Sequence, residues 1–196
     1  MGEEIRPGHG DALLIVDVQN DFLPGGSLAV PYGDEVVPVL NHYFKLFRDN
    51  QLPVYASRDW HPTDHCSFIS QGGQWPPHCI QYSRGAEFSE ALHLPSQTIV
   101  VSKATDQMQD AYSAFQSTGL VNKLKKSGIK RLFVGGLATD YCILSTVNDA
   151  LDNGFQVYLL VDAIRAVDKQ FGDGDRAIHA MEQHGSRLVR LSEFLV

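Results

Sequence analysis

The chain of 196 residues has few cysteines, no long hydrophobic run and no block of like charges. Its three cysteines include no C-x-x-C pair and fit free thiols in a reducing compartment better than a disulfide framework. No stretch approaches the roughly 18 apolar residues that a membrane-spanning helix requires. The first ten residues carry charged side chains and no apolar core, so we expect no signal peptide there. These absences predict a cytoplasmic protein without a membrane partner.

The charge balance limits the classes of partner further. The chain has 16 basic and 23 acidic residues, a net charge of −7 at pH 7, and such a surface repels the phosphates of nucleic acids. Glycine and proline contents are ordinary and 43% of the residues are apolar, which excludes collagen-like and disordered chains. A chain of this length buries roughly 70% of its surface on folding. We expect a single domain over residues 1–196 and a small-molecule partner, with no nucleic acid.

Short apolar runs alternate with segments of helical periodicity. The predicted strands are residues 12–16, 53–57, 98–102, 131–135, 156–161 and 187–190. The predicted helices are residues 34–50, 120–126, 140–153 and 175–184. This alternation predicts an α/β fold of three layers, α/β/α, in which helices cover both faces of a six-stranded parallel sheet. The connection over residues 59–96 is rich in proline and has little periodicity, and a loop of that length usually serves a function.

Chemically useful side chains stand at the ends of four predicted strands. Asp17 follows the first strand, Asp59 the second and Lys103 the third, and Cys142 lies a few residues past the fourth. Ligands of open parallel sheets bind outside the carboxyl ends of the strands, near the point where the strand order reverses. Each of these residues alone also fits a turn cap, a surface charge or a small core residue. Their coincidence at four strand ends is what indicates a site.

Cys142 is the candidate nucleophile. It stands in the segment G-G-L-A-T-D-Y-C, in the first turn of the helix predicted over residues 140–153. The positive end of a helix dipole favours a thiolate, and unsatisfied backbone N–H groups there can bind an oxyanion. Asp17 as proton acceptor and Lys103 as a nearby cation complete the parts of a nucleophilic catalyst. The alternative interpretation is a buried, inert cysteine.

A cluster of histidines opens the long connection. Asp59, His61 and His65 fall close together, and His78 follows within the same loop. One carboxylate and three imidazoles suit Zn, Fe or Mn, with positions left open for water. The spacing is not that of a zinc finger and H-E-x-x-H is absent, so solvated loop histidines are the alternative interpretation. Large loop side chains near the same strand ends are candidates for the wall of a pocket. They are Phe22, Leu28, Trp75 and Tyr112.

Four features together resemble the cysteine hydrolases of the isochorismatase-like superfamily and, within it, the nicotinamidases. They are D-V-Q-N-D-F at residues 17–22, D-W-H-P-T-D-H at residues 59–65, Lys103, and G-L-A-T-D-Y-C at residues 136–142. The set D-W-H…H…H is the part that points to the nicotinamidases. The resemblance covers nearly the whole chain and implies a sheet with the strand order 3-2-1-4-5-6.

Carried over residue by residue, the resemblance assigns roles to matching positions. The implied triad is Asp17, Lys103 and Cys142. The implied oxyanion hole is formed by the backbone N–H groups of Ala138 and Cys142, with a cis peptide bond between Leu137 and Ala138. The implied ligands of one divalent metal, with zinc expected before iron or manganese, are Asp59, His61, His65 and His78. The pocket positions of the family fall on Phe22, Trp75 and Tyr112. Tyr141 departs from the family, because many relatives have histidine there, and we expect it to alter the rim of the pocket.

The implied reaction is the hydrolysis of nicotinamide to nicotinic acid and ammonia through a thioester on Cys142, as in NAD salvage. The metal would hold the pyridine nitrogen, and the family also suggests a homo-oligomer. One alternative is an amidase of the same superfamily that acts on a carbamoyl or ureido compound. Another is a non-catalytic metal-binding protein. A nucleotide-binding module is disfavoured because the chain has no G-x-G-x-x-G and no Walker loop after its first strand.

Overall fold

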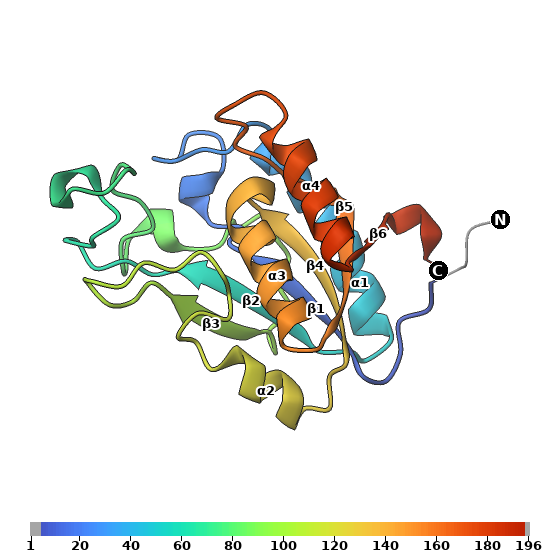
Figure 1. Ribbon diagram of the computed structural model, residues 1–196. Helices are drawn as coiled ribbons and strands as arrows, with labels where there is room; N and C mark the ends of the chain where they lie inside the picture. The colour runs from blue at the N-terminus through green and yellow to red at the C-terminus, as the bar shows by residue number, and fades with distance from the viewer. Residues whose placement is uncertain (1–4, 195–196) are drawn as a thin grey trace.

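The computed structural model describes residues 5–194 and contains one parallel sheet of six strands. The strands are β1 (Asp11–Val16), β2 (Val54–Asp59), β3 (Ile99–Lys103), β4 (Arg131–Leu137), β5 (Gln156–Arg165) and β6 (Arg187–Val189). Their order is β3-β2-β1-β4-β5-β6 (Figure 1), which confirms the predicted order. The first four residues of the segment in which we expect no signal peptide lie outside the described range.

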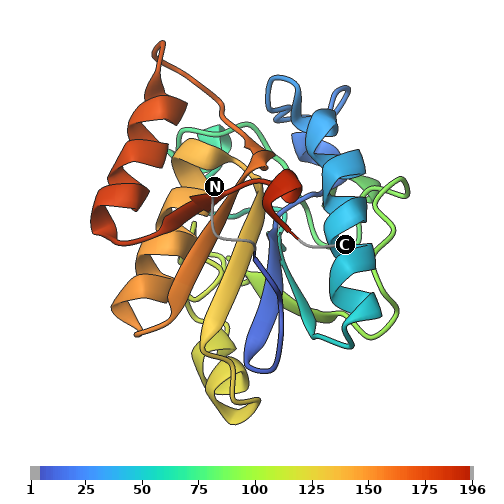
Figure 2. The same ribbon diagram turned by 90° about the vertical axis from the view of Figure 1, so that its right-hand side faces the viewer.

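Helices cover both faces of this sheet, as predicted. They are α1 (Val36–Asp49), α2 (Leu120–Lys126), α3 (Leu144–Asp152) and α4 (Asp173–His184). Figure 2 shows α1 on one side of the sheet and α3 and α4 on the other. Successive side chains of a strand point to opposite faces, so Leu13 of β1 packs into the core beneath α1 while Leu14 packs into the core beneath α3. All six residues of β1 are buried for this reason.

The observed boundaries differ from the predicted ones at the functional edge of the sheet. β2 and β3 run further than predicted, so Asp59 and Lys103 are the last residues of their strands, directly opposite each other in the register. α3 begins at Leu144, later than predicted, because Thr139–Ile143 form a single π-helical turn before it. Cys142 therefore lies in that turn and not in the first turn of an α-helix. Such single π-turns are frequent at functional sites.

Gly136 allows β4 to approach β1 beside this turn. Its φ is +124°, and a Cβ atom there would lie 2.1 Å from the carbonyl oxygen of Val16. Only glycine avoids this clash in that conformation. The glycine of the G-L-A-T-D-Y-C segment thus keeps the strands that carry Asp17 and the Cys142 turn in close contact.

The long connection after β2 is ordered by contacts more than by regular structure. Between Asp59 and residue 96 it contains only the short 3-10 turns Ile69–Gln71 and Arg84–Ala86, two isolated β-bridges within the connection and one from Phe88 to Gln19. Several of its side chains are nevertheless fully or almost fully buried: His61, His65, Phe68, Trp75 and His78. In the same described range, no helix is both long enough and apolar enough to cross a membrane.

Candidate active site

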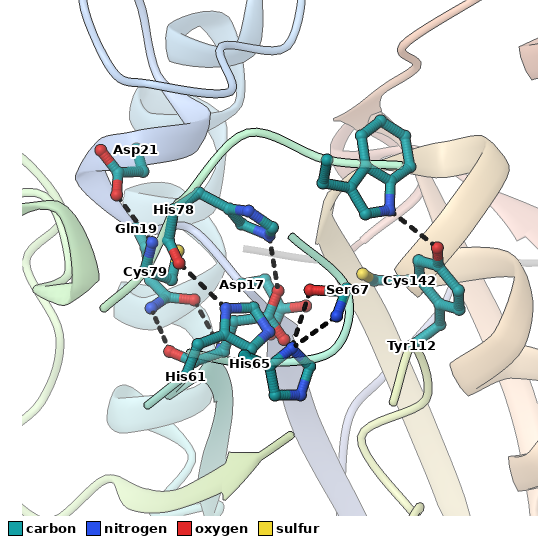
Figure 3. Close-up of polar contacts among 12 residues, drawn as sticks. Asp17, Gln19, Asp21, His61, His65, Ser67, His78, Cys79, Tyr112 and Cys142 are labelled. Carbon is teal, nitrogen blue, oxygen red and sulfur yellow. Dashed lines mark hydrogen bonds and ion pairs between the residues drawn. The ribbon is translucent and has the colours of Figure 1, made fainter. Parts of the chain in front are cut away.

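The structure brings the four strand-end residues together in one buried cluster. Figure 3 shows two of them, Asp17 and Cys142, beside the predicted metal ligands of the long connection. The Nζ atom of Lys103 lies 3.0 Å from an oxygen of Asp17 and 3.6 Å from the sulfur of Cys142. It also forms an ion pair with Asp59. Lys103 is only 1% exposed, so its charge is balanced by the two carboxylates and not by water. The cluster thus holds a thiol, two carboxylates and one cation within direct reach of each other.

Asp17 presents its two oxygens to different partners. Oδ1 accepts a hydrogen bond of 2.7 Å from the hydroxyl of Ser57. Oδ2 is buried and faces the ammonium of Lys103 at 3.0 Å. One carboxylate oxygen of Asp17 lies within 4.8 Å of the sulfur of Cys142. The side chain therefore has one oxygen fixed by Ser57 and one that is able to accept a proton.

Burial determines the resting charge of the thiol. It raises the pKa of the Cys142 thiol well above its usual range, and the cation of Lys103 offsets this only in part. Burial also raises the pKa of Asp17 against the opposing effect of Lys103. Cys142 therefore rests as a neutral thiol. This burial beside carboxylates opposes the thiolate that a helix terminus would favour, and the sulfur lies in a π-helical turn and not at the start of an α-helix.

Lys103 keeps its charge in this environment. Burial by itself opposes that charge, but the carboxylates of Asp17 and Asp59 raise the pKa of Lys103 well above its usual range. Burial likewise opposes the charge of Asp59, yet Lys103 and the nearby imidazoles lower its pKa. The buried ion pair between Lys103 and Asp59 is thus charged on both sides.

Three of the four predicted metal ligands converge next to this ion pair. Asp59, His61 and His78 are buried, and each has a ligand atom within 4.8 Å of those of the other two. Nδ1 of His61 contacts the carbonyl oxygen of His78 at 2.9 Å, and Nδ1 of His78 contacts that of Pro76 at 2.8 Å. A backbone carbonyl on one ring nitrogen leaves the other nitrogen for a metal. Burial lowers the pKa of His61 to about 4, so this imidazole is neutral, as a ligand must be.

His65 lies beside this group but is turned differently. Its ring centroid is 4.3 Å from that of His61, while its Nδ1 contacts the hydroxyl of Ser67 at 2.7 Å. Its Nε2 contacts the carbonyl oxygen of Gln109 at 3.2 Å. Among the described residues, its ligand atom groups with those of His61 and the exposed Asp110, and not with Asp59. One carboxylate and the neighbouring imidazoles nevertheless form a donor set that fits a divalent metal.

A cavity with largely apolar walls opens onto both groups of residues. The five predicted pocket side chains all line it: Phe22, Leu28, Trp75, Tyr112 and Tyr141. The same cavity reaches Cys142 and His78. The indole N–H of Trp75 donates a 2.9 Å hydrogen bond to the hydroxyl of Tyr112, and the ring of Trp75 meets that of Tyr141 edge to face. These walls suit a small flat ring with a polar substituent.

The backbone implied for an oxyanion hole borders the same space. The peptide bond between Leu137 and Ala138 is cis, as the resemblance implies. Ala138 and Cys142 both line the cavity, and both are buried.

With this geometry in view, comparison with known proteins gives the family. Residues 11–193 match the isochorismatase domain family. The chain belongs to the isochorismatase family. It is 40% identical to the nicotinamidase of Escherichia coli K12 over 93% of this chain and 96% of that protein. It is similar to the structure of the pyrazinamidase of Pyrococcus horikoshii in complex with zinc, with a TM-score of 0.89 and 43% identity over 93% of this chain and 99% of the other.

A second similar structure contains a small-molecule ligand. PnC1 from L. infantum in complex with nicotinate superimposes with a TM-score of 0.88 and 38% identity, over 95% of this chain and 96% of that one. The fold of this family member is thus similar to that of a protein whose structure was determined in complex with nicotinate.

Sequence reasoning missed several residues that shape the site of this family member. Gln19 fixes the end of β2 through two hydrogen bonds to the backbone of Asp59. Its side-chain N–H donates one of 2.7 Å to the carbonyl oxygen of Asp59, and its side-chain oxygen accepts one of 2.7 Å from the N–H of Asp59. Ser57 donates a hydrogen bond to Asp17. Val30 and Val167 line the cavity, and Lys169 lies over the ring of Trp75. Gln19 lies inside D-V-Q-N-D-F, but nothing in that segment reveals that its amide is buried.

Proposed function

We propose that the protein is a nicotinamidase that hydrolyses nicotinamide to nicotinic acid and ammonia. The observation that carries this proposal is the position of Cys142, Asp59 and His78 at the same cavity, whose walls include four aromatic rings. A nucleophile and a set of metal ligands at one cavity suit an aromatic ring that has an amide on one carbon, for the nucleophile, and a nitrogen in the ring, for the metal. Curated relatives named nicotinamidase, at 37–40% identity, support the assignment.

The first half of the reaction forms a thioester. The thiol of Cys142 gives its proton to Oδ2 of Asp17, the oxygen that Ser57 does not bind, and the sulfur attacks the amide carbon. The backbone N–H groups of Ala138 and Cys142 stabilise the oxyanion of the tetrahedral intermediate. Asp17 then returns the proton to the amide nitrogen, the C–N bond breaks, and ammonia leaves. A resting thiol with a raised pKa needs such a base within reach, which Asp17 provides.

The second half releases the acid. Asp17 takes a proton from water, the oxygen of the water attacks the thioester carbon, and the C–S bond breaks. The proton on Asp17 then restores the thiol of Cys142, so that nicotinamide and one water yield nicotinic acid and ammonia. Lys103 stays charged throughout and balances the negative charge that passes between Cys142 and Asp17. It is not itself a nucleophile, because its pKa is raised.

The residues that would hold the metal are Asp59, His61 and His78, with His65 beside them. We propose zinc, with iron and manganese as alternatives, since carboxylate and imidazole donors suit all three. When bound, the ion would supply a Lewis-acidic contact for the pyridine nitrogen and so orient the ring. The carboxamide then faces Cys142, which lines the same cavity.

We also propose that the protein works in the cytoplasm, in a salvage reaction for NAD, and self-associates. Cys66, Cys79 and Cys142 are all free thiols, which fits a reducing compartment.

The experiment that tests the function is ammonia release from nicotinamide, measured on purified protein before and after chelation and dialysis. We expect activity that chelation removes and that Zn, Fe or Mn restores. Activity that survives complete removal of metal would contradict the role given to Asp59, His61 and His78 while leaving the cysteine chemistry intact. Release of ammonia only from carbamoyl or ureido compounds would replace nicotinamide as the substrate.

A further inference from the structure

The loop between β5 and α4 brings one cation to the outer side of the cavity wall. The Nζ atom of Lys169 lies 3.9 Å from the centroid of the Trp75 ring and 6.0 Å from that of Tyr141. Over residues 5–194, no carboxylate oxygen pairs with this Nζ within 4.0 Å. Lys169 therefore faces aromatic rings and not an acidic side chain. A cation within about 6 Å of an indole face is attracted by the quadrupole of the ring.

The main chain around Lys169 is fastened to the turn that carries the nucleophile. The two carboxylate oxygens of Asp140 accept hydrogen bonds of 2.9 Å from the N–H groups of Val167 and Asp168. Asp168 in turn accepts one of 2.8 Å from the N–H of Gly174, in the first turn of α4. The loop is thus held just before Lys169, and its Val167 lines the cavity. The position of the cation is tied to the segment that contains Cys142.

Trp75 comes from a different part of the chain, the long connection after β2. Its backbone pairs with the neighbouring segment, because its N–H donates to Ser67 and its carbonyl oxygen accepts from Ile69. Its indole is held at the nitrogen by the hydroxyl of Tyr112. One of its ring faces is covered by Lys169. The ammonium of Lys169 therefore joins the loop after β5 to the ring of Trp75 in the cavity wall.

We propose that Lys169 is a positioning residue for the pocket. Its ammonium holds Trp75 against the ring of the substrate and thereby sets the affinity of the site for a pyridine. This inference rests on the proposed function, because it takes the ligand to be a pyridine carboxamide or carboxylate. Lys169 acts through Trp75 and does not take part in proton transfer. Its loss should accordingly weaken binding of ligand and leave the chemical step intact.

The test compares three variants of the zinc-loaded protein. Lys169→Met removes the charge and keeps the length of the side chain, and Lys169→Arg keeps the charge. Lys125→Met removes an exposed charge from α2, which Figures 1 and 2 show at the end of the molecule away from the loop between β5 and α4. The measurements are the Kd of nicotinate by calorimetry, KM and kcat for nicotinamide, and the quenching of tryptophan fluorescence by acrylamide. Trp60 adds the same background in every variant.

For Lys169→Met we expect Kd and KM to rise about three- to tenfold, with kcat changed by no more than about twofold. Quenching of Trp75 should increase because its ring is less firmly held. Lys169→Arg and Lys125→Met should match the parent. Unchanged Kd and unchanged quenching in Lys169→Met would overturn the proposal, as would an equal loss in Lys169→Arg. A parent that neither binds nicotinate nor releases ammonia overturns the proposed function instead, and the quenching comparison still tests the Lys169–Trp75 contact alone.

Discussion

Lys103 and Asp59 lie opposite each other at the ends of β3 and β2 and form a buried ion pair. Lys103 also contacts Asp17 and the sulfur of Cys142, while the second oxygen of Asp59 faces His78 at 4.0 Å. The nucleophile and the metal ligands are therefore linked through this one pair. The family resemblance assigns Lys103 to the catalytic triad and Asp59 to the metal ligands, and it does not predict the ion pair between them.

Removing the shared cation should destabilise the metal-free protein. We expect Lys103→Met to lower the free energy of unfolding by about 3–5 kcal/mol, because Asp17 and Asp59 would stay buried without a counter-charge. Zinc should restore part of this loss, since it supplies a cation to Asp59. Urea unfolding with and without zinc measures both effects, with Lys125→Met as an exposed control that should match the parent. A metal-free Lys103→Met protein as stable as the parent would contradict the charge balance described above.

Removing the nucleophile should separate chemistry from metal binding. We expect Cys142→Ala to lower kcat for nicotinamide by about 10⁴-fold or more, because no thioester can form. Its metal content, measured by elemental analysis after dialysis, should equal that of the parent, because the proposed ligands Asp59, His61 and His78 stay in place, although the sulfur of Cys142 lies within 4.8 Å of Asp59. Loss of the metal in this variant would show that the sulfur supports the metal site.

The raised pKa of Cys142 predicts how the rate of alkylation of its thiol depends on pH. At pH 7–8 the metal-free protein should be alkylated by iodoacetamide more slowly than a model cysteine, and the rate should rise as the pH increases toward the folded-state pKa. Burial is the main cause, and Asp17 adds to it. Asp17→Asn should therefore speed alkylation at pH 8 while it abolishes hydrolysis.

Mass spectrometry of the peptide that contains Cys142 gives this rate, and the partly exposed Cys66 in the same digest serves as an internal reference. For an inert structural cysteine, Asp17→Asn would not combine faster alkylation of Cys142 with loss of hydrolysis.

Ser57 should matter through the base that it orients. It is fully buried and donates to Oδ1 of Asp17, and this hydrogen bond lowers the pKa of Asp17 against the larger, raising effect of burial. Ser57→Ala should lower kcat/KM about tenfold at neutral pH. The acid limb of its pH profile should move to higher pH, because Asp17 must lose its proton before it can act as a base. Ser57→Thr, which keeps the hydroxyl, should recover the parent profile, and an unmoved limb in Ser57→Ala would rule out this role.

The sequence by itself determined the layers of the fold and the principal residues of the site. Continuous apolar runs such as β1 require cover on both faces of the sheet, and parallel strands place their carboxyl ends, with Asp17 and Cys142, on one edge. The segments at residues 17–22, 59–65 and 136–142 carried the family likeness and, with it, the strand order. These features are local, so periodicity and motif spacing reveal them.

Only the tertiary structure decided the charges and the supporting contacts. Whether Cys142 rests as a thiol depends on burial and on carboxylates from other strands, which no local pattern contains. The extension of β2 to Asp59, the bond from Gln19 that fixes it, and the contact of Lys169 with Trp75 all join segments far apart in the chain. Such contacts depend on which surfaces the completed fold brings together, and a single sequence does not show that.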